Sequence, residues 1–149
     1  MRVLLQRVRQ ASVTIGGAPV AAIGPGVLAL VGVGHGDDGA TADALATKVA
    51  ELRMFADEAG RTNRSILDVR GAALVVSQFT LYADTSRGRR PGFTRAAPGL
   101  VAEALYRRFA EALRAAGVTD VQTGRFGEVM AIELVNDGPF TIWLDSAER

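Results

Sequence analysis

A run of ten residues, Ala72-Ala73-Leu74-Val75-Val76-Ser77-Gln78-Phe79-Thr80-Leu81, constrains the fold of this chain more than any other segment. Its first half is continuously apolar rather than alternating, which is typical of a strand covered on both faces at the centre of a sheet. Its second half carries Ser77, Gln78 and Thr80, whose polar groups either satisfy neighbouring backbone or serve a site. The sequence therefore predicts a central strand over 72–81, with side chains alternating between two faces at its polar end.

Turn signals separate further apolar segments that have the character of strands. Gly24-Pro25-Gly26 lies between two of them, near the N-terminus. Short aliphatic runs bounded by glycine and proline favour a meander of three strands in this part of the chain. In all, five further strands are expected, over residues 2–15, 20–23, 27–33, 130–135 and 140–144.

Two other segments have the spacing of helices. A helix is expected over 41–55 with Asp38 or Thr41 as its cap, because apolar residues recur there every three or four positions. These apolar residues are Leu45, Val49, Leu52 and Phe55. A second helix is expected to begin at Pro98 and to stop at Gly117, which can adopt the left-handed conformation that ends helices. The face of this helix that carries Leu105, Phe109 and Leu113 should cover a sheet.

Length and composition favour one globular domain over residues 1–149. The chain has 48% hydrophobic and 22% charged residues, which are ordinary values for such a domain. The predicted fold class is α+β, with a mostly antiparallel or mixed, barrel-like sheet and two main helices packed on it. No apolar run is long enough to cross a membrane and the N-terminal residues do not form a signal peptide, so a cytoplasmic location is expected. The chain has no cysteine, which excludes disulfides, thiolate metal sites and a cysteine nucleophile.

The segment Asn136-Asp137-Gly138-Pro139-Phe140-Thr141 is an unusual corner between two apolar runs. Asn-Gly or Asp-Gly alone would be the ordinary choice for a hairpin turn. Pro139 has no amide hydrogen and Gly138 has wide backbone freedom, so carbonyl groups here can point away from a sheet partner. The dipeptide Gly138-Pro139 is therefore a candidate functional element built from main chain.

A basic loop is predicted over 83–95. The net charge of the chain is only +1, but this segment carries four arginines and one aspartate together with glycines and a proline. Arginine presents a planar fork of donors that suits phosphate oxygens, although a solvated surface loop would have the same composition. The candidate phosphate contacts are Arg87, Arg89, Arg90 and Arg95.

Two separated motifs occur in a fixed order along the chain. The first is Ser77-Gln78-Phe79-Thr80-Leu81-Tyr82-Ala83-Asp84 followed by Gly88-Arg89-Arg90-Pro91, and the second is Asn136 to Thr141. Together they resemble the D-aminoacyl-tRNA deacylases, a family that removes D-amino acids wrongly attached to tRNA. The likeness begins at Gln6-Arg7-Val8 and spans the whole chain, which makes it far more specific than one motif.

The resemblance implies a homodimer that acts on the 3′ end of a tRNA carrying a D-amino acid or glycine, with no cofactor and no role for membrane or DNA. In the family, the segment that matches Ser77 to Thr80 lines the pocket for the aminoacyl-adenosine end of the tRNA. The residues carried over as substrate contacts are Ser77, Gln78, Phe93, Ala96 and Ala97.

The resemblance also implies that the bond between Gly138 and Pro139 is cis and reaches into the pocket of the partner subunit. The side chain of an L-residue would strike this corner, whereas the α-amino group of a D-residue can lie against it. Glycine has no side chain to exclude, so activity on glycyl-tRNA, such as glycine wrongly attached to tRNA-Ala, is expected as well. Arg7 and Asn136 are carried over as residues that support the corner.

An aminoacyl ester needs an activated nucleophile and groups that stabilise the oxyanion. Thr80 is the obvious protein nucleophile, but an unassisted hydroxyl is weak. The resemblance favours a water assisted by the ribose 2′-hydroxyl of the tRNA, with a backbone amide near Phe79 holding the carbonyl oxygen. Phe79 and Thr80 are therefore the candidate catalytic residues, and no metal is expected because no carboxylates have the spacing of a metal site.

Two alternatives from other functional classes remain open at this point. The chain could be a non-catalytic module that binds RNA ends through the arginine loop and strand aromatics. It could also be a hydrolase of small esters that uses Thr80 or Ser77 with His35, the single histidine of the chain.

Overall fold

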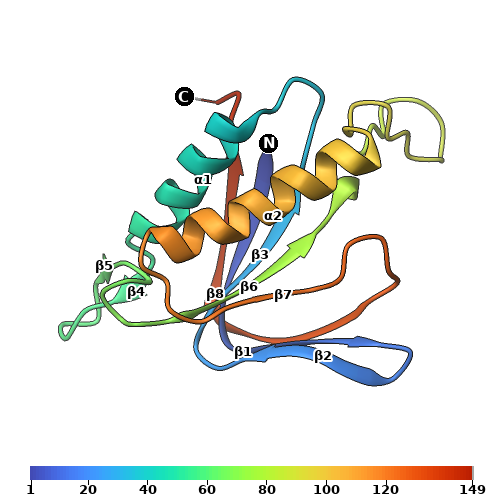
Figure 1. Cartoon of the computed structure of the whole chain (residues 1–149). Coiled ribbons are helices and arrows are strands. Elements are labelled where there is room, and N and C mark those ends of the chain that lie inside the picture. Colours follow the sequence, from blue (N-terminus) through green and yellow to red (C-terminus); the bar gives the residue numbers. More distant parts are fainter. Residues whose placement is uncertain (149) are drawn as a thin grey trace.

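The core of the protein is a mixed sheet, which the computed structural model describes together with the rest of residues 1–148 (Figure 1). Its strands follow the order β2-β1-β3-β6-β7, and β8 pairs with β1 as well. β1 is antiparallel to its three partners, whereas β3, β6 and β7 run parallel to one another. The strands are β1 (Arg2–Ile15), β2 (Ala18–Ile23), β3 (Gly26–Gly32), β6 (Ala72–Ser77), β7 (Val121–Thr123) and β8 (Ala131–Asp145).

Two α-helices connect the parallel strands and lie over one side of the sheet (Figure 1). Helix α1 (Gly39–Glu51) lies in the connection from β3 to β6, and α2 (Gly99–Ala115) lies between β6 and β7. Arg108 of α2 forms a bidentate pair with Asp43 of α1, with Nη2 2.6 Å and Nε 2.9 Å from the two carboxylate oxygens. The remaining elements are a small hairpin of β4 (Phe55–Ala56) and β5 (Thr62–Arg64), and the 3-10 helix η1 (Phe79–Tyr82).

Both faces of the sheet are packed with apolar side chains. Leu5 and Val75 belong to the larger cluster, which joins the sheet to both helices. Val8 and Leu74 belong to a second cluster, which is formed by residues of strands β1, β2, β3 and β6. Residues 72–76 are buried, as their continuous apolar character predicts. The predicted α+β class, with a mixed sheet that nearly closes like a barrel and two main helices, is confirmed.

Local signals located the helices well. Asp38 is the N-cap of α1, and its carboxylate accepts a hydrogen bond from the Thr41 amide at 2.8 Å. Gly117 follows α2 with a φ of +107°, as expected for a left-handed end. The first helix ends at Glu51 rather than Phe55, because Leu52 already has an extended backbone.

Three strand predictions were wrong in detail. The first three strands are not a meander, because β3 pairs with the first half of β1 rather than with β2. The predicted strand over 72–81 ends at Ser77 and continues as η1, so side chains at 79–80 do not alternate across a sheet. The runs at 130–135 and 140–144 are not two strands joined by a turn, since both, apart from Met130, lie within β8 and pair with β1.

No helix among the described residues combines the length and the apolar character that crossing a membrane requires.

Candidate active site

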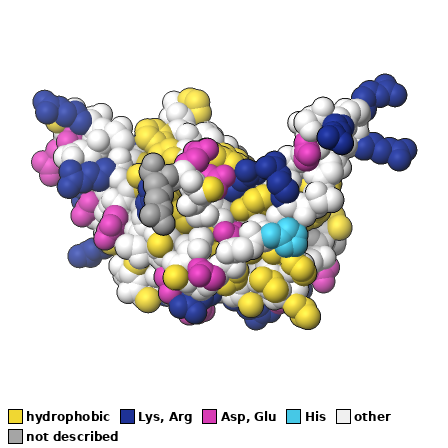
Figure 2. Space-filling view, turned by 90° about the horizontal axis from the view of Figure 1, so that it is seen from above, with side chains coloured by type: hydrophobic (Ala, Val, Ile, Leu, Met, Phe, Trp, Pro, Cys, Tyr) yellow, Lys and Arg dark blue, Asp and Glu magenta, His cyan; other side chains and the backbone are white. Residues whose placement is uncertain are grey.

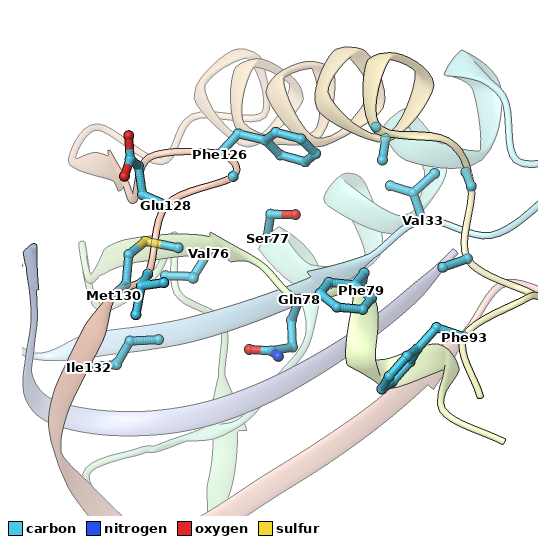
Figure 3. A pocket seen from close by; sticks show the side chains of 16 residues that line it. Val33, Val76, Ser77, Gln78, Phe79, Phe93, Phe126, Glu128, Met130 and Ile132 are labelled. Carbon is cyan, nitrogen blue, oxygen red and sulfur yellow. The ribbon is translucent and has the colours of Figure 1, made fainter. Parts of the chain in front are cut away.

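A cavity of about 610 Å³ lies where the three parallel strands end (Figure 3). Val33 follows β3, Ser77 closes β6, and the segment 126–130 follows β7, so each strand delivers lining residues with its carboxyl end. In sheets with parallel strands, ligands bind in crevices at these ends. The cavity brings together six residues predicted from the sequence, which are Ser77, Gln78, Phe79, Phe93, Ala96 and Ala97.

The aromatic wall of the cavity is formed by Phe79 and Phe93 (Figure 3). Their rings meet edge to face, with centroids 5.0 Å apart and planes at 71°. Phe79 keeps 54% of its surface exposed, although it is a large apolar residue. In Figure 3 the Ser77 hydroxyl points into the space between this wall and Phe126.

The wall opposite Phe79 was not predicted from the sequence. Residues 126–130 line the cavity together with Ile132 of β8, and among the described lining residues Glu128 alone carries a charge. The available signal was a phenylalanine between two glycines, Gly124-Arg125-Phe126-Gly127, directly after the short strand β7. A loop of this kind at the end of a parallel strand is where binding residues tend to occur.

Thr80 does not line the cavity, unlike the three residues before it. Its hydroxyl oxygen accepts a hydrogen bond from the side-chain amide of Gln78. This contact couples Thr80 to the orientation of Gln78, and within residues 1–148 no basic side chain accepts a hydrogen bond from the hydroxyl.

Helix η1, which carries Phe79 and Thr80, is anchored by Arg2 of β1, which also contacts β8. Arg2 donates to the Leu81 carbonyl at 2.8 Å and to the Asp145 carboxylate at 2.8 Å. Its guanidinium lies 4.4 Å from the centre of the Tyr82 ring. Burial raises the pKa of Tyr82 to about 12, with the nearby Asp37 carboxylate acting in the same direction. The end of η1 is thus fixed by a charged hydrogen bond and by packing.

Close packing beside η1 requires a glycine at position 34. A Cβ added to Gly34 would lie 2.5 Å from the Tyr82 ring. The same residue forms a bridge to Ala96, and Ala97 donates to the Val33 carbonyl at 2.9 Å. These contacts place Ala96 and Ala97 against the end of β3, where they close the cavity.

His35 is exposed and does not line the cavity with Ser77. Its Nε2 lies 3.0 Å from the Thr94 carbonyl oxygen. A carbonyl can only accept, so Nε2 carries the hydrogen and is not free to act as a base from this position.

The segment from Asp137 to Phe140, inside the sequence motif Asn136 to Thr141, is a bulge in β8. Gln6 of β1 pairs with Thr141, and Val8 pairs with Asn136, so Arg7 alone lies opposite four residues of β8. Such an excess forces the longer strand out of the sheet. The bond between Gly138 and Pro139 is cis, and both residues are exposed. No residue of this bulge lines the cavity of its own chain.

Arg7 lies under the bulge and contacts it at three points. Its Nε donates to the Asp137 carbonyl at 3.0 Å and lies 3.4 Å from the Asp137 carboxylate, and its guanidinium lies 4.5 Å from the centre of the Phe140 ring. A Cβ added to Gly138, whose φ is +135°, would lie 2.9 Å from Nη2 of Arg7. Arg7 also donates to the Met54 carbonyl, which ties the bulge to the segment after α1. Asn136 accepts from the Phe140 amide at 3.1 Å and so bridges the base of the bulge.

The basic loop projects from the body of the protein. Asp84 and Gly92 close it with two backbone hydrogen bonds of 2.7 and 2.9 Å. The dark blue side chains at the upper right of Figure 2 extend from the region where Figure 1 shows this loop. Within residues 1–148, none of its four arginines forms an ion pair, and those arginines are Arg87, Arg89, Arg90 and Arg95.

Comparison with known proteins identifies the family. The family model described as D-Tyr-tRNA(Tyr) deacylase matches residues 4–145. A D-aminoacyl-tRNA deacylase of Thermomicrobium roseum (strain ATCC 27502 / DSM 5159 / P-2) is 67% identical over 148 residues, which cover 99% of this chain and 96% of that protein. One from Roseiflexus sp. (strain RS-1) is 62% identical over 147 residues, covering 99% and 94%. This chain belongs to the D-Tyr-tRNA(Tyr) deacylase family.

Solved structures agree with this family fold. A c-Myc DNA Unwinding Element Binding Protein superposes with a TM-score of 0.92 at 38% identity, over 97% of this chain and 98% of that one. A probable eukaryotic D-amino acid tRNA deacylase superposes with a TM-score of 0.83 at 20% identity, over 96% and 97%, and that likeness concerns the fold alone. The family consists of ester hydrolases by name, so this chain is an enzyme rather than a binding module.

Proposed function

We propose that this chain hydrolyses the ester bond of D-aminoacyl-tRNA and releases the free D-amino acid and tRNA. The observation that carries the proposal is the cavity lined by Ser77, Gln78 and Phe79 in a member of a deacylase family. At about 610 Å³ the cavity is within the range of pockets that bind ligands of the size of an aminoacyl nucleoside. Residues 1–149 would form one catalytic domain.

Selection against L-residues would come from the bulge of a second copy of the chain. Gly138 and Pro139 of the bulge are exposed and do not reach their own cavity, which leaves them free to enter the cavity of a partner in a homodimer. The main chain around Gly138 and Pro139 would occupy the space where an L side chain points. Because this filter acts by exclusion, it would accept many D-residues and would also accept glycine, including glycine attached to tRNA-Ala.

The chemical step would use the substrate's own ribose. The 2′-hydroxyl of the terminal adenosine would assist a water whose oxygen attacks the ester carbonyl carbon, after which the bond to the 3′-oxygen breaks and that oxygen takes up a proton. The amide of Phe79 would stabilise the oxyanion, since preorganised donors act strongly in a site that excludes water. Thr80 would orient Gln78 through their hydrogen bond rather than attack the ester.

The tRNA would approach over the basic loop. Phe93 lies in the cavity wall and belongs to the same segment as the arginines of this loop, between Arg90 and Arg95, so a strand whose last base enters the cavity would pass them. Arginine side chains without carboxylate partners can bind phosphate without breaking an existing pair. A protein that acts on charged tRNA would work in the cytoplasm.

The test is deacylation of D-tyrosyl-tRNA and L-tyrosyl-tRNA in parallel. Release of D-tyrosine with the L-ester left intact is expected, and sedimentation at the same protein concentration should give a dimer. Two intact esters would indicate an RNA-binding module. Loss of activity in His35→Ala would revive a small-ester hydrolase, whereas the proposal expects that variant to keep the wild-type rate.

A further inference from the structure

One side chain of β1 joins the two arms of the bulge in β8. The side-chain oxygen of Gln6 accepts a hydrogen bond from the Asn136 amide at 2.7 Å and a second one from the Thr141 hydroxyl. Asn136 is the last residue before the bulge and Thr141 is the first residue after it, as their pairing with β1 shows. A single acceptor atom therefore holds the points where the chain leaves the sheet and returns to it.

The contact continues into the bulge itself. The oxygen of the Asn136 side chain accepts from the Phe140 amide at 3.1 Å, while its nitrogen donates to Gln6. Both ends of this side chain are thus engaged, and its orientation follows from the position of the Gln6 oxygen. The amide that Asn136 binds belongs to Phe140, the residue after Pro139. Two successive hydrogen bonds, between Gln6 and Asn136 and between Asn136 and Phe140, therefore connect β1 to the exposed corner.

Gln6 and Arg7 support the bulge from opposite faces. Adjacent residues of a strand point to opposite sides of the sheet. Arg7 lies on the side of Leu5, which packs with the helices, whereas Gln6 lies on the side of Val8, which packs in the second cluster. Arg7 holds the Asp137 carbonyl at 3.0 Å, and Gln6 holds the two arms. Neither side chain lines the cavity.

We propose that Gln6 is a positioning residue that sets the stereochemical selectivity of the enzyme, through the acceptor oxygen that closes the base of the bulge. This inference rests on the proposed function. A corner that excludes by clash discriminates only as well as its main chain is fixed, because a small displacement opens the excluded volume. Gln6 fixes both ends of that main chain while touching no substrate.

The experiment separates the acceptor from the rest of the side chain. Gln6→Met keeps the length but removes the oxygen, whereas Gln6→Glu keeps an acceptor for both donors. Within residues 1–148 the Gln6 amide nitrogen has no acceptor, so Gln6→Glu breaks none of the described bonds. Gln10→Met is the matched control, since Gln10 lies on the same strand, is exposed and makes no side-chain hydrogen bond within the described residues.

The measured quantity is the ratio of kcat/KM for D-tyrosyl-tRNA to that for L-tyrosyl-tRNA. We expect this ratio to fall at least tenfold in Gln6→Met, chiefly through faster release of L-tyrosine, and to stay within about twofold of the wild type in Gln6→Glu and Gln10→Met. A role in stability alone would lower the melting temperature without moving the ratio. Thr141→Val removes one of the two donors and should lower the ratio in the same direction by less, which provides a test if Gln6→Met does not fold.

An unchanged ratio in folded Gln6→Met, or in Thr141→Val where the former does not fold, would overturn the inference. An equal fall in Gln6→Met and Gln6→Glu would overturn the role of the acceptor. If the wild type releases neither residue, or both at the same rate, the proposed function itself fails, and that result is obtained before any variant is made.

Discussion

Replacing Arg7 by methionine tests how strongly the bulge is braced. The variant keeps an unbranched side chain of similar length but removes the donors to the carbonyls of Asp137 and Met54. A hydrogen bond from a charged donor contributes about 1.5–3 kcal/mol. The Arg7 side chain is only 14% exposed, so water can replace these donors in part at most.

The expected loss is about 3 kcal/mol, the low end of the sum for two bonds, because desolvation of the guanidinium offsets part of the gain in the native protein. For a chain of this length each kcal/mol lowers the melting temperature by about 2–4 °C, which predicts a decrease of roughly 6–12 °C. Urea unfolding and thermal melts should both be recorded at one protomer concentration, because the stability of a dimer depends on concentration.

Arg9→Met is the control for charge. Arg9 contacts the same Asp137 carboxylate at 3.2 Å, but its side chain is 75% exposed. An exposed pair of this kind contributes less than about 1 kcal/mol. Equal losses in Arg9→Met and Arg7→Met, or a loss below about 1 kcal/mol in Arg7→Met, would contradict the view that the brace is built from carbonyl contacts of a shielded guanidinium.

Three further predictions use other positions. Gly138→Ala places a Cβ 2.9 Å from Arg7 at a φ of +135°, so it should cost about 1–3 kcal/mol in urea unfolding and raise release of L-tyrosine; wild-type selectivity would refute it. Thr80→Ala should retain most deacylation of D-tyrosyl-tRNA, and complete loss with unchanged tRNA binding would return the hydroxyl to the chemistry. Burial raises the pKa of Tyr106 to about 12, above its unfolded value near 10, so stability present below pH 10 is lost as the pH rises toward 12. Tyr106→Phe should lose less free energy of unfolding between about pH 10 and 12 than the wild type. Parallel curves of unfolding free energy against pH for the two proteins would refute the role of Tyr106 in this loss.

Features set by neighbouring residues could be predicted from the sequence. Each of three such features depends on residues only a few positions away along the chain. They are the cap at Asp38, the left-handed glycine at 117 and the buried run at 72–76. Other residues of the cavity were predicted through a family resemblance rather than from local pattern, namely Ser77, Gln78, Phe79, Phe93, Ala96 and Ala97.

Features that depend on a distant strand were not predicted. Residues 79–81 follow a buried strand and were predicted to extend it, yet β3 ends at Gly32 and offers no further partner, so the chain turns into η1. The apolar runs on either side of Gly138-Pro139 have the pattern of a hairpin, and only their common pairing with β1 makes them one strand with a bulge. The wall at Phe126 joins the cavity because β7 lies beside β6, which no local pattern indicates.

The supports of the corner lie on the most extensively paired strand of the protein. β1 pairs with β2, β3 and β8, and it places Gln6 and Arg7 next to each other in sequence but on opposite faces of the sheet. The proposed filter consists of main chain, so its geometry would be altered mainly through substitution of the residues that hold it. Selectivity in this enzyme should therefore be most sensitive to changes on β1, at side chains that never meet the substrate. Catalysis should instead be most sensitive to changes where β3, β6 and β7 end, because the cavity lies there.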